Sequence, residues 1–395
     1  MLKVHCAARL HLLGAVIATT VICSVLVPSA VAAAVPGARS TFQSALDHLV
    51  SSPQGPPGVI AVVEHGSTPA VFQAGRAVTS ASSPLRAEDH IRVASVAKAF
   101  SGAAALALVS RHTLSLDDTI GQRLPNLPKP WDGVTLAQLL HHTSGIPDFS
   151  ACPTFQHALV ASLLDPPPPK QLLNYVQEPP CYKSDKPLEF TPGTKYRYSN
   201  SDNVIVGLMI EAATNGDYST VLSDDVLQPL GLSQTSLPSS AIMPEPFIHG
   251  YAPDPPQAPE DVSQAVAAGW SWASGGVVST PADANRFVRA YVRGSLTDAT
   301  TRAKQFRFVK GTSEPPGPGT NSAGLAVFRY KTDCGTVFGH TGNTLGYTQF
   351  VAASSNGSNS VSVTVNEQIT PKMRAALFPQ LRKIFELGVC AAMKG

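Results

Sequence analysis

The sequence predicts an α+β fold, in which helices flank an antiparallel sheet and a mainly helical subdomain is inserted into the chain. Two observations support this prediction: strand-like runs separated by turns occur near both termini, and long apolar helical patterns occupy the middle. We therefore expect residues 35–80 and 265–395 to form one discontinuous α/β subdomain. Residues 81–264 are expected to form the mainly helical subdomain.

The strands of the expected sheet come from both ends of the chain. Residues 58–64 form a β-branched run, and after a Gly-Ser-Thr-Pro turn residues 70–74 continue as a second strand, which predicts a hairpin. Residues 346–353 and 361–365 are two further strand-like runs with an Asn-Gly turn between them. Short connections of this kind predict antiparallel pairing at both ends of the chain.

A helical pattern over residues 371–387 follows the last strand, and Pro379 is expected to kink that helix because proline cannot donate a backbone hydrogen bond. The chain also contains three proline-rich stretches, which cannot form regular helix or central strand. We expect them to be surface loops. These stretches are Pro166–Pro169, Pro244–Pro259 and Pro315–Pro318.

The composition excludes several classes of protein. The chain has 395 residues, of which 43% are hydrophobic and 14% charged, so it can fill a sizeable core. A small disulfide-stapled peptide and an intrinsically disordered chain are therefore excluded. Two of the 29 basic residues and none of the 27 acidic residues lie in the first 34 positions, which leaves no net charge in the remainder. Nucleic-acid binding driven by counterion release is therefore not expected.

The first residues have the pattern of a secretory signal. Lys3 and Arg9 precede an apolar run over residues 10–27, and small residues follow at Ala30-Val31-Ala32. We expect residues 1–34 to be a signal peptide and the mature protein to be secreted or held at the extracytoplasmic surface, without a stable membrane anchor. The alternative is an uncleaved anchor, because the run is near the shortest length that spans a bilayer.

Four of the six cysteines lie outside the predicted signal, an even number in an oxidising compartment. We expect two disulfides. Four cysteines allow three connectivities, and we prefer the pairs that are close in sequence, Cys152 with Cys181 and Cys334 with Cys390. A zinc site is the alternative, but no CxxC or HxH spacing accompanies these cysteines. His141-His142 is expected to anchor a loop rather than to bind a metal.

A single lysine lies in an otherwise apolar helical pattern. The 18 residues between Arg92 and Arg111 are rich in Ala and Leu, as in a buried central helix, and Lys98 is the charged residue among them. Because burying an ammonium group is costly, Lys98 either reaches the surface or has a chemical role. Ser95 lies three residues earlier on the same helix face, in the first turn, where the helix dipole favours developing negative charge. The pair predicts a serine nucleophile with a lysine as its base.

An acyl-transfer serine also needs a proton shuttle, an oxyanion hole and groups that hold the substrate. Two further clusters are candidates for these roles. Tyr198-Ser199-Asn200 opens a second probable helix, and His340-Thr341-Gly342 lies at the start of a strand. An exposed strand edge at the second cluster could pair with an extended substrate.

The three clusters, taken in order, resemble the three motifs of the serine penicillin-recognising enzymes. They are Ser95-Val96-Ala97-Lys98, Tyr198-Ser199-Asn200 and His340-Thr341-Gly342. This family comprises D-alanyl-D-alanine carboxypeptidases, class C beta-lactamases and related esterases. Residues 139–149, 191–200 and 274–287 also match its secondary signatures. The resemblance implies a beta-lactamase/transpeptidase-like fold over most of the mature chain.

The resemblance implies a catalytic mechanism that uses three residues. Ser95 attacks a carbonyl carbon and becomes acylated. Lys98 and Tyr198 share the proton transfers that activate the serine and release the leaving group. No metal ion and no other cofactor is implied. The implied ligands are a small peptide or ester substrate, with beta-lactams as acylating ligands because their strained amide resembles the D-Ala-D-Ala bond.

The resemblance also assigns residues that bind the substrate. Asn200 is implied to contact the substrate amide, and the backbone N–H of Asn343 to form the oxyanion hole together with that of the nucleophile. His340 and Thr341, next to Gly342, are implied to line the cleft and to help bind a substrate carboxylate.

Two departures from the family's pattern bear on the substrate. His340 stands where class C beta-lactamases usually have lysine, and histidine there is more like the carboxypeptidase and esterase branches. Asn343 stands where several carboxypeptidases have a second hydroxyl residue. The nearby cation on the preceding strand is Arg329, and the sequence does not establish which face of the strand it occupies.

The leading hypothesis is a secreted serine hydrolase of the D-alanyl-D-alanine carboxypeptidase type, which acts on peptidoglycan peptides and reacts with penicillin. An esterase or a beta-lactamase of the same family is the alternative within the same chemistry. A protein of another class, a non-catalytic peptidoglycan-binding or regulatory module, is less expected because Ser95, Lys98 and Tyr198 are all present.

Overall fold

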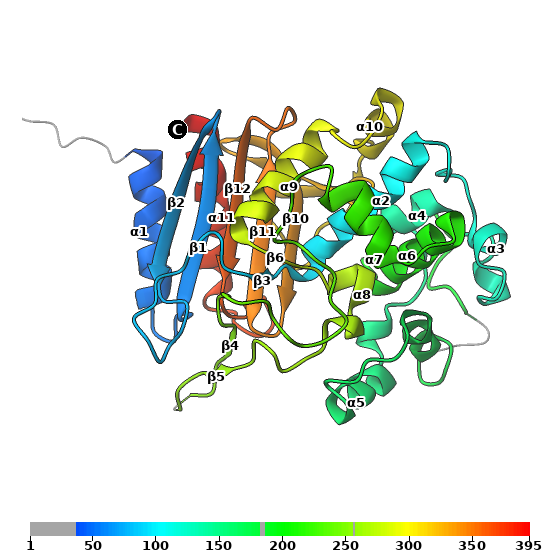
Figure 1. The fold of residues 1–395 in the computed structure, drawn as a ribbon, viewed down its shortest axis with the longest axis horizontal. Coiled ribbons are helices and arrows are strands. Elements are labelled where there is room, and N and C mark those ends of the chain that lie inside the picture. The colour runs from blue at the N-terminus through cyan, green and yellow to red at the C-terminus, as the bar shows by residue number, and fades with distance from the viewer. Residues whose placement is uncertain (1–36, 182–185, 256) are drawn as a thin grey trace, which may run out of the picture. The chain divides into compact units, whose positions relative to one another are not determined.

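The computed structural model describes residues 37–181, 186–255 and 257–395. Within these residues eight strands form an antiparallel sheet, which lies in the left half of Figure 1. The strand order is β2-β1-β12-β11-β10-β9-β8-β7. The strands are β1 Gly58–His65, β2 Thr68–Gly75, β7 Val309–Lys310, β8 Thr320–Ala323, β9 Phe328–Thr332, β10 Gly335–Thr344, β11 Tyr347–Ala353 and β12 Asn359–Val365. The predicted signal segment, residues 1–34, lies outside the described residues.

The two ends of the chain meet where β1 pairs with β12. The register places Val59 opposite Val365 and Val63 opposite Val361. Alternate residues of β1 enter two different cores, because Val59 and Val63 lie in one apolar cluster and Ile60 in the other. The hairpin predicted over residues 58–74 and the two strands predicted near the C-terminus are confirmed.

Helices cover both faces of this sheet. Figure 1 shows α1 (Ala38–Ser51) and α11 (Phe378–Lys394) on one face and α9 (Pro281–Arg293) on the other. The prediction that Pro379 kinks the last helix is wrong. The helix begins at Phe378, so Pro379 lies in its first turn, where its missing N–H has no helical partner to lose.

The middle of the chain is largely helical, and its two central helices are α2 (Ala97–Ser110) and α6 (Asn200–Thr214). Every residue of α2 from Ala97 to Val109 is buried, as its apolar pattern predicts. The other α-helices are α3 Ile120–Arg123, α4 Leu136–Leu140, α5 Pro153–Ala161, α7 Tyr218–Leu222, α8 Trp272–Gly275 and α10 Ala299–Gln305. Short 3₁₀ turns are η1 Ala94–Val96, η2 Lys129–Trp131, η3 Phe149–Ala151, η4 Pro169–Val176 and η6 Ala268–Trp270, and Ser223–Leu227 (η5) is a π-helical turn.

Two small strand pairs complete the secondary structure: β3 (Ile91–Arg92) with β6 (Val278–Ser279), and β4 (Tyr251–Ala252) with β5 (Glu260–Asp261). The architecture is that of the expected α+β class. The described residues, from Gly37 onward, form one compact unit, so the division into an α/β subdomain and a helical subdomain stays a prediction.

Two disulfides join the pairs of cysteines that are close in sequence, as predicted. Cys152 is bonded to Cys181, and Cys334, in the turn between β9 and β10, is bonded to Cys390 on α11.

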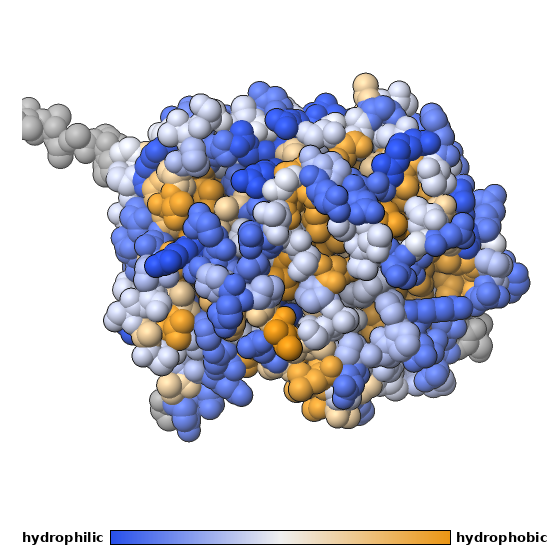
Figure 2. Space-filling view, in the orientation of Figure 1, coloured by the Kyte–Doolittle hydropathy of each residue, from blue (hydrophilic) through white to orange (hydrophobic). Residues whose placement is uncertain are grey.

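In Figure 2 polar side chains cover most of the face seen in Figure 1, and apolar groups gather at its lower edge near α5. No helix within the described residues is long and apolar enough to cross a membrane.

Candidate active site

Ser95 lies on a 3₁₀ turn that immediately precedes α2. We expected one continuous helix from before Ser95, but the structure has the turn η1 (Ala94–Val96) and then α2. The three-residue spacing still brings Ser95 Oγ to 3.2 Å from Lys98 Nζ. Ser95 is half-buried, whereas the Lys98 side chain is completely buried. The predicted pair of nucleophile and base is therefore in hydrogen-bond contact.

Lys98 has three hydrogen-bond partners within the described residues, and all of them can accept. They are Ser95 Oγ at 3.2 Å, Asn200 Oδ1 at 2.7 Å and the Ser274 carbonyl at 2.7 Å. Burial lowers the pKa of Lys98 to about 7, an effect that nearby carboxylates partly oppose. A neutral amine has two N–H bonds and one lone pair. When the N–H bonds point to Asn200 and Ser274, the lone pair is left for the Ser95 proton.

Tyr198 lies close to Lys98. The ring centroid is 5.0 Å from Lys98 Nζ, and the hydroxyl is buried without a hydrogen-bond partner in the part of the chain that the structure describes. Burial raises the pKa of Tyr198 well above 10, and the nearby Ser95 hydroxyl partly opposes this rise. In this resting site Tyr198 is therefore a neutral phenol, which can pass a proton on but is a poorer initial base than Lys98.

Asn200 is held by the turn that contains Asp148 and Ser150. Its amide Nδ2 donates to Asp148 Oδ2 at 3.0 Å and to Ser150 Oγ at 2.9 Å. Both amide hydrogens are thus engaged, and the amide oxygen faces Lys98. Asn200 orients the lysine in this structure. Its predicted contact with a substrate amide would require one of these two hydrogen bonds to be released.

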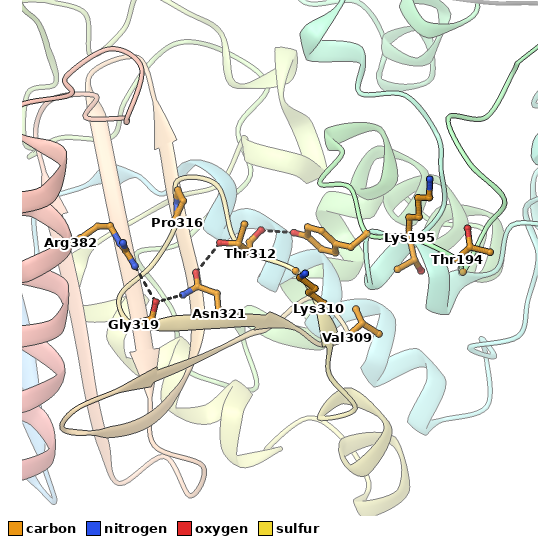
Figure 3. A pocket seen from close by; sticks show the side chains of 13 residues that line it. Thr194, Lys195, Val309, Lys310, Thr312, Pro316, Gly319, Asn321 and Arg382 are labelled. Atoms are coloured by element: carbon orange, nitrogen blue, oxygen red, sulfur yellow. Dashed lines mark hydrogen bonds between the residues drawn. The ribbon is translucent and has the colours of Figure 1, made fainter.

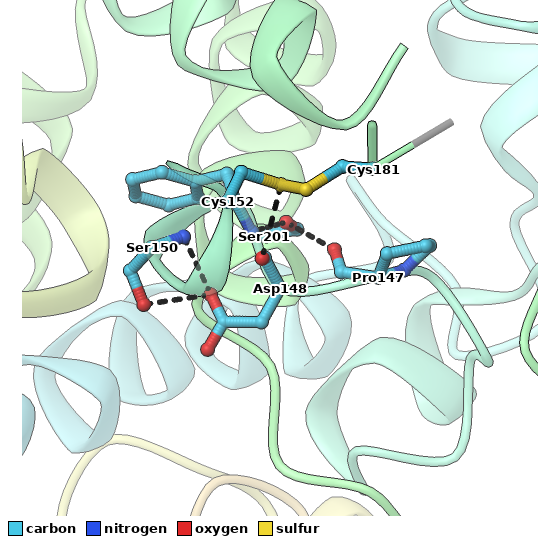
Figure 4. Close-up of a disulfide and its surroundings, with 7 residues drawn as sticks. Pro147, Asp148, Ser150, Cys152, Cys181 and Ser201 are labelled. Atoms are coloured by element: carbon cyan, nitrogen blue, oxygen red, sulfur yellow. Dashed lines mark hydrogen bonds between the residues drawn. A yellow bond between two sulfur atoms is a disulfide. The ribbon is translucent and has the colours of Figure 1, made fainter. Parts of the chain in front are cut away.

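The Cys152–Cys181 disulfide lies next to this turn (Figure 4). Asp148 Oδ1 accepts from the Ser150 backbone N–H and hydroxyl, both at 3.0 Å. Ser201, on α6, donates to the Pro147 carbonyl at 2.7 Å. The turn that holds Asn200 is therefore fixed by its own hydrogen bonds, by α6 and by a covalent bond.

A buried polar cluster of His142, Ser144 and Asp202 packs against Tyr198. The ring of His142 lies 4.5 Å from the Tyr198 ring, and its Nδ1 is 2.9 Å from Asp202 Oδ2. Ser144 donates to the other oxygen of Asp202 at 2.5 Å. His142 thus anchors its loop on α6, as we expected for this histidine pair. The described residues contain no group of three or more potential metal ligands of the His, Cys, Asp or Glu type.

The third motif lies towards the end of β10, not at the start of a strand as predicted. Pairing of β10 with β9 ends at Gly339. From His340 onward, β10 therefore extends beyond the end of β9. A Cβ atom built on Gly342 would lie 2.6 Å from the Val93 carbonyl and 3.0 Å from the Ser95 backbone nitrogen. Glycine is therefore needed for β10 to approach the nucleophile this closely.

The predicted oxyanion hole involves the residue that follows this glycine. Asn343 comes directly after the point of contact with Ser95, and its side-chain oxygen accepts a hydrogen bond from Gln368 at 2.6 Å. Its side chain is thus tied back to the loop after β12. The role of the Asn343 and Ser95 backbone N–H groups in binding an oxyanion stays a prediction.

His340 and Thr341 are completely buried. Burial lowers the pKa of His340 to about 3, so the ring is neutral at physiological pH. Its Nδ1 donates to the Thr341 carbonyl, which leaves Nε2 as an acceptor without a partner among the described residues. The Thr341 hydroxyl donates to the Pro315 carbonyl at 2.6 Å. As they stand, neither side chain offers a charge or a free donor to a substrate carboxylate.

Arg329 is also engaged elsewhere. Its Nε donates to Ser322 Oγ at 3.0 Å, and its guanidinium carbon lies 4.5 Å from the centroid of the Phe308 ring. These contacts answer the question that the sequence left open about its orientation, because they hold the guanidinium against β8 and an aromatic ring.

Three functional contacts were missed from the sequence, and their signals differed. Ser274 begins the stretch at residues 274–287 that was seen as a signature, but its contribution is a backbone carbonyl, a role that no side-chain pattern indicates. Asp148 belongs to the stretch at residues 139–149, so the signature was seen but its chemical role was not. Glu314 directly precedes the proline-rich stretch Pro315–Pro318, which we interpreted as a surface loop, yet its charge acts on Lys98.

The chain is similar in sequence to a known protein family and to curated proteins. A family model described as beta-lactamase matches residues 42–384. Penicillin-binding protein 4* of Bacillus subtilis is 24% identical over 308 residues, which cover 73% of this chain and 63% of that protein. A putative D-alanyl-D-alanine carboxypeptidase of Escherichia coli is 27% identical over 153 residues, covering 37% of this chain and 31% of that protein. The chain thus spans less than two thirds of the length of these curated relatives.

Solved structures share the fold. A D-stereospecific amidohydrolase from Streptomyces has a TM-score of 0.73 at 28% identity, with 83% of this chain and 94% of that chain covered. D-amino acid amidase from Ochrobactrum anthropi SV3, in a complex with D-phenylalanine, has a TM-score of 0.74 at 21% identity, covering 89% and 98% of the two chains. The predicted beta-lactamase/transpeptidase-like fold is confirmed.

Proposed function

The chain belongs to the beta-lactamase family of serine hydrolases, and on this premise we propose that it hydrolyses small acyl substrates through an acyl-enzyme formed on Ser95. The observation that supports this most strongly is the contact between Ser95 Oγ and Lys98 Nζ at 3.2 Å, together with the lowered pKa of Lys98. Neutral Lys98 takes the Ser95 proton as Oγ attacks the carbonyl carbon. The alternative of a non-catalytic binding protein gives no reason for this arrangement.

The proton then moves to the leaving group. As the tetrahedral intermediate collapses, the bond to the leaving nitrogen or oxygen breaks and that atom takes a proton from Lys98, directly or through the Tyr198 hydroxyl. In the second half-reaction water attacks the ester carbonyl carbon and gives its proton to the same base. The bond between the acyl carbon and Ser95 Oγ then breaks, and Oγ takes the proton back as the acid is released. The backbone N–H groups of Ser95 and Asn343 are proposed to stabilise the oxyanion in both steps.

Peptides that end in D-Ala-D-Ala are the first substrate candidate. Two relatives support it, since one is named a penicillin-binding protein and another a putative D-alanyl-D-alanine carboxypeptidase. Beta-lactams are then expected to acylate Ser95. An extracytoplasmic location belongs to the same proposal, and the two disulfides support it.

Amides or esters without a free carboxylate are the second candidate. The burial of His340 and Thr341 favours it, because a carboxypeptidase needs groups that bind the terminal carboxylate. The solved amidohydrolase with 28% identity is D-stereospecific by its name, which is compatible with either candidate.

The experiment is an intact-mass time course of the mature protein mixed with benzylpenicillin, with Ser95→Ala in parallel. We expect an adduct on the wild type and none on the variant. A persistent adduct indicates an enzyme that penicillin inhibits, and an adduct that disappears as penicillin is consumed indicates a beta-lactamase. An adduct on Ser95→Ala would contradict the assignment of the nucleophile. Repeated turnover of any acyl substrate excludes the non-catalytic alternative.

A further inference from the structure

The loop Thr312–Gly319, which we call the proline loop, lies against the third motif. The hydroxyl of Thr341 donates to the Pro315 carbonyl at 2.6 Å, and both residues are buried. The Tyr330 hydroxyl donates to Ser313 Oγ on the same loop at 3.0 Å. The loop therefore places a carbonyl oxygen at the hydrogen-bond donor that the family resemblance assigns to a substrate carboxylate.

The proline loop is held from its other side by three elements (Figure 3). The Tyr196 hydroxyl donates to the Thr312 carbonyl. Asn321 Oδ1, on β8, accepts from the Gly317 backbone N–H and from the Thr312 hydroxyl, both at 3.0 Å. Arg382, on α11, donates to the Gly317 carbonyl at 2.9 Å. These contacts fix the proline loop in place between the third motif and a cavity of about 840 Å³.

Glu314 adds a negative charge to the proline loop. Its side chain is exposed. Partial desolvation and the charge of Asp148 raise the pKa of its carboxyl group, and the charges of Lys98 and Arg197 oppose this rise. The third motif does not balance this charge, because His340 is neutral and Arg329 is held against an aromatic ring. A carboxylate placed beside Thr341 would meet a like charge and a hydroxyl whose hydrogen is already donated.

We propose that the proline loop determines leaving-group specificity: through the Pro315 carbonyl and the Glu314 carboxylate it disfavours leaving groups with a free carboxylate and favours neutral and, still more, ammonium-bearing amines. The substrate class is therefore amides rather than peptides with a free C-terminal carboxylate. This inference rests on the proposed acyl-enzyme function of Ser95. Glu314 acts here as a specificity-determining residue and takes no part in bond formation.

The test compares three substrates that share one acyl group, N-acetyl-D-alanine, and differ in the amine released. The amines are D-alanine, D-alanine amide and 1,2-diaminoethane, which bear a carboxylate, no charge and an ammonium group beside the scissile amide. We measure kcat/KM for each with the wild type, with Glu314→Gln and with a control, Glu260→Gln, whose exposed carboxylate lies on β5.

The wild type is expected to follow the order ammonium, neutral, carboxylate, with about tenfold between neighbouring substrates. Glu314→Gln should compress both ratios about three- to fivefold, by raising kcat/KM for the carboxylate substrate and lowering it for the ammonium substrate. Glu260→Gln should leave them unchanged. A wild type that prefers the carboxylate substrate, or ratios that Glu314→Gln does not alter, would overturn the inference.

Labelling of Ser95 by benzylpenicillin separates this inference from the function on which it rests. If Ser95 is labelled and the carboxylate substrate is preferred, the specificity proposal alone is wrong. If Ser95 is not labelled and none of the three amides is cleaved, the acyl-enzyme function is wrong and the specificity proposal with it. Circular dichroism checks that Glu314→Gln is folded. Because benzylpenicillin itself bears a carboxylate beside its scissile amide, the inference predicts faster labelling of this variant than of the wild type.

Discussion

Lys98, on α2, and His340, on β10, are two completely buried bases, and they differ in what burial does to them. Burial lowers the pKa of both groups, to about 7 for Lys98 and to about 3 for His340. Lysine starts well above physiological pH, so the shift brings it into the working range. The solution pKa of histidine is already within that range, so the same effect moves the pKa of His340 below it.

The polar surroundings of the two bases reinforce this difference. Lys98 has three acceptors within 3.2 Å, so its amine is held in one orientation towards Ser95. His340 donates from one nitrogen and has no partner for the other in the described part of the chain. Burial lowers the pKa of a group that is charged when protonated. A buried lysine, whose pKa starts above 7, can therefore become a base at physiological pH, whereas a buried histidine, whose pKa starts near 7, cannot.

Removing the amine of Lys98 is expected to have the largest effect. Lys98→Met keeps the volume of the side chain but cannot accept a proton, so the rate of Ser95 acylation should fall about a thousandfold. Lys98→Arg should be similarly slow, because guanidinium stays protonated. Stopped-flow or intact-mass acylation by an activated ester measures both. An arginine variant within tenfold of the wild type would show that Lys98 acts as a charge rather than as a base.

Asp148→Asn is expected to have an intermediate effect. The turn would hold Asn200 less well, so kcat/KM should fall about tenfold. Because the Asp148 carboxylate raises the pKa of Lys98, its removal should also move the acid limb of the acylation profile to lower pH. A purely structural role would lower the rate without moving the limb. Asp165→Asn, an exposed carboxylate on the loop after α5, is the matched control.

The two disulfides allow a further comparison between a region next to the site and one far from it. In the chain-entropy model, closed loops of 29 and 56 residues contribute about 4 kcal/mol each to the free energy of unfolding. Replacing either pair by alanine should therefore lower urea stability by similar amounts. Only loss of Cys152–Cys181, which borders the Asp148 turn, should also lower kcat/KM, by a few-fold. Equal losses of activity in both double variants would contradict this coupling.

The smallest effect is expected for His340→Gln. If His340 is neutral throughout the working range, replacing it by a neutral residue should change the acylation rate less than about threefold and leave its pH dependence between pH 5 and 9 unchanged. Circular dichroism establishes that the variant is folded. A new or lost ionisation in the pH profile would show that His340 titrates during catalysis and that the contrast with Lys98 is wrong.

Much of the fold and the core of the site could be predicted from local sequence. The β-branched runs of β1 and β12, the apolar length of α2 and the spacing from Ser95 to Lys98 each depend on nearby residues. The Ser274 carbonyl, the acceptor at Pro315 and the charge of Glu314 come from segments far along the chain. Such contacts depend on tertiary packing, and this is why the carboxylate-binding role of His340 and Thr341 was expected while their burial was not.

The most direct test of the account is the pH dependence of the wild-type acylation rate, measured with an uncharged activated ester under single-turnover conditions. The neutral fraction of Lys98 increases with pH, so the rate should rise through a single ionisation with a midpoint near pH 7 and level off above about pH 8. Absence of that limb in Lys98→Met would assign it to this residue. A rate that is flat from pH 5 to 9, or that rises only near pH 10, would contradict the assignment of buried Lys98 as the base that activates Ser95.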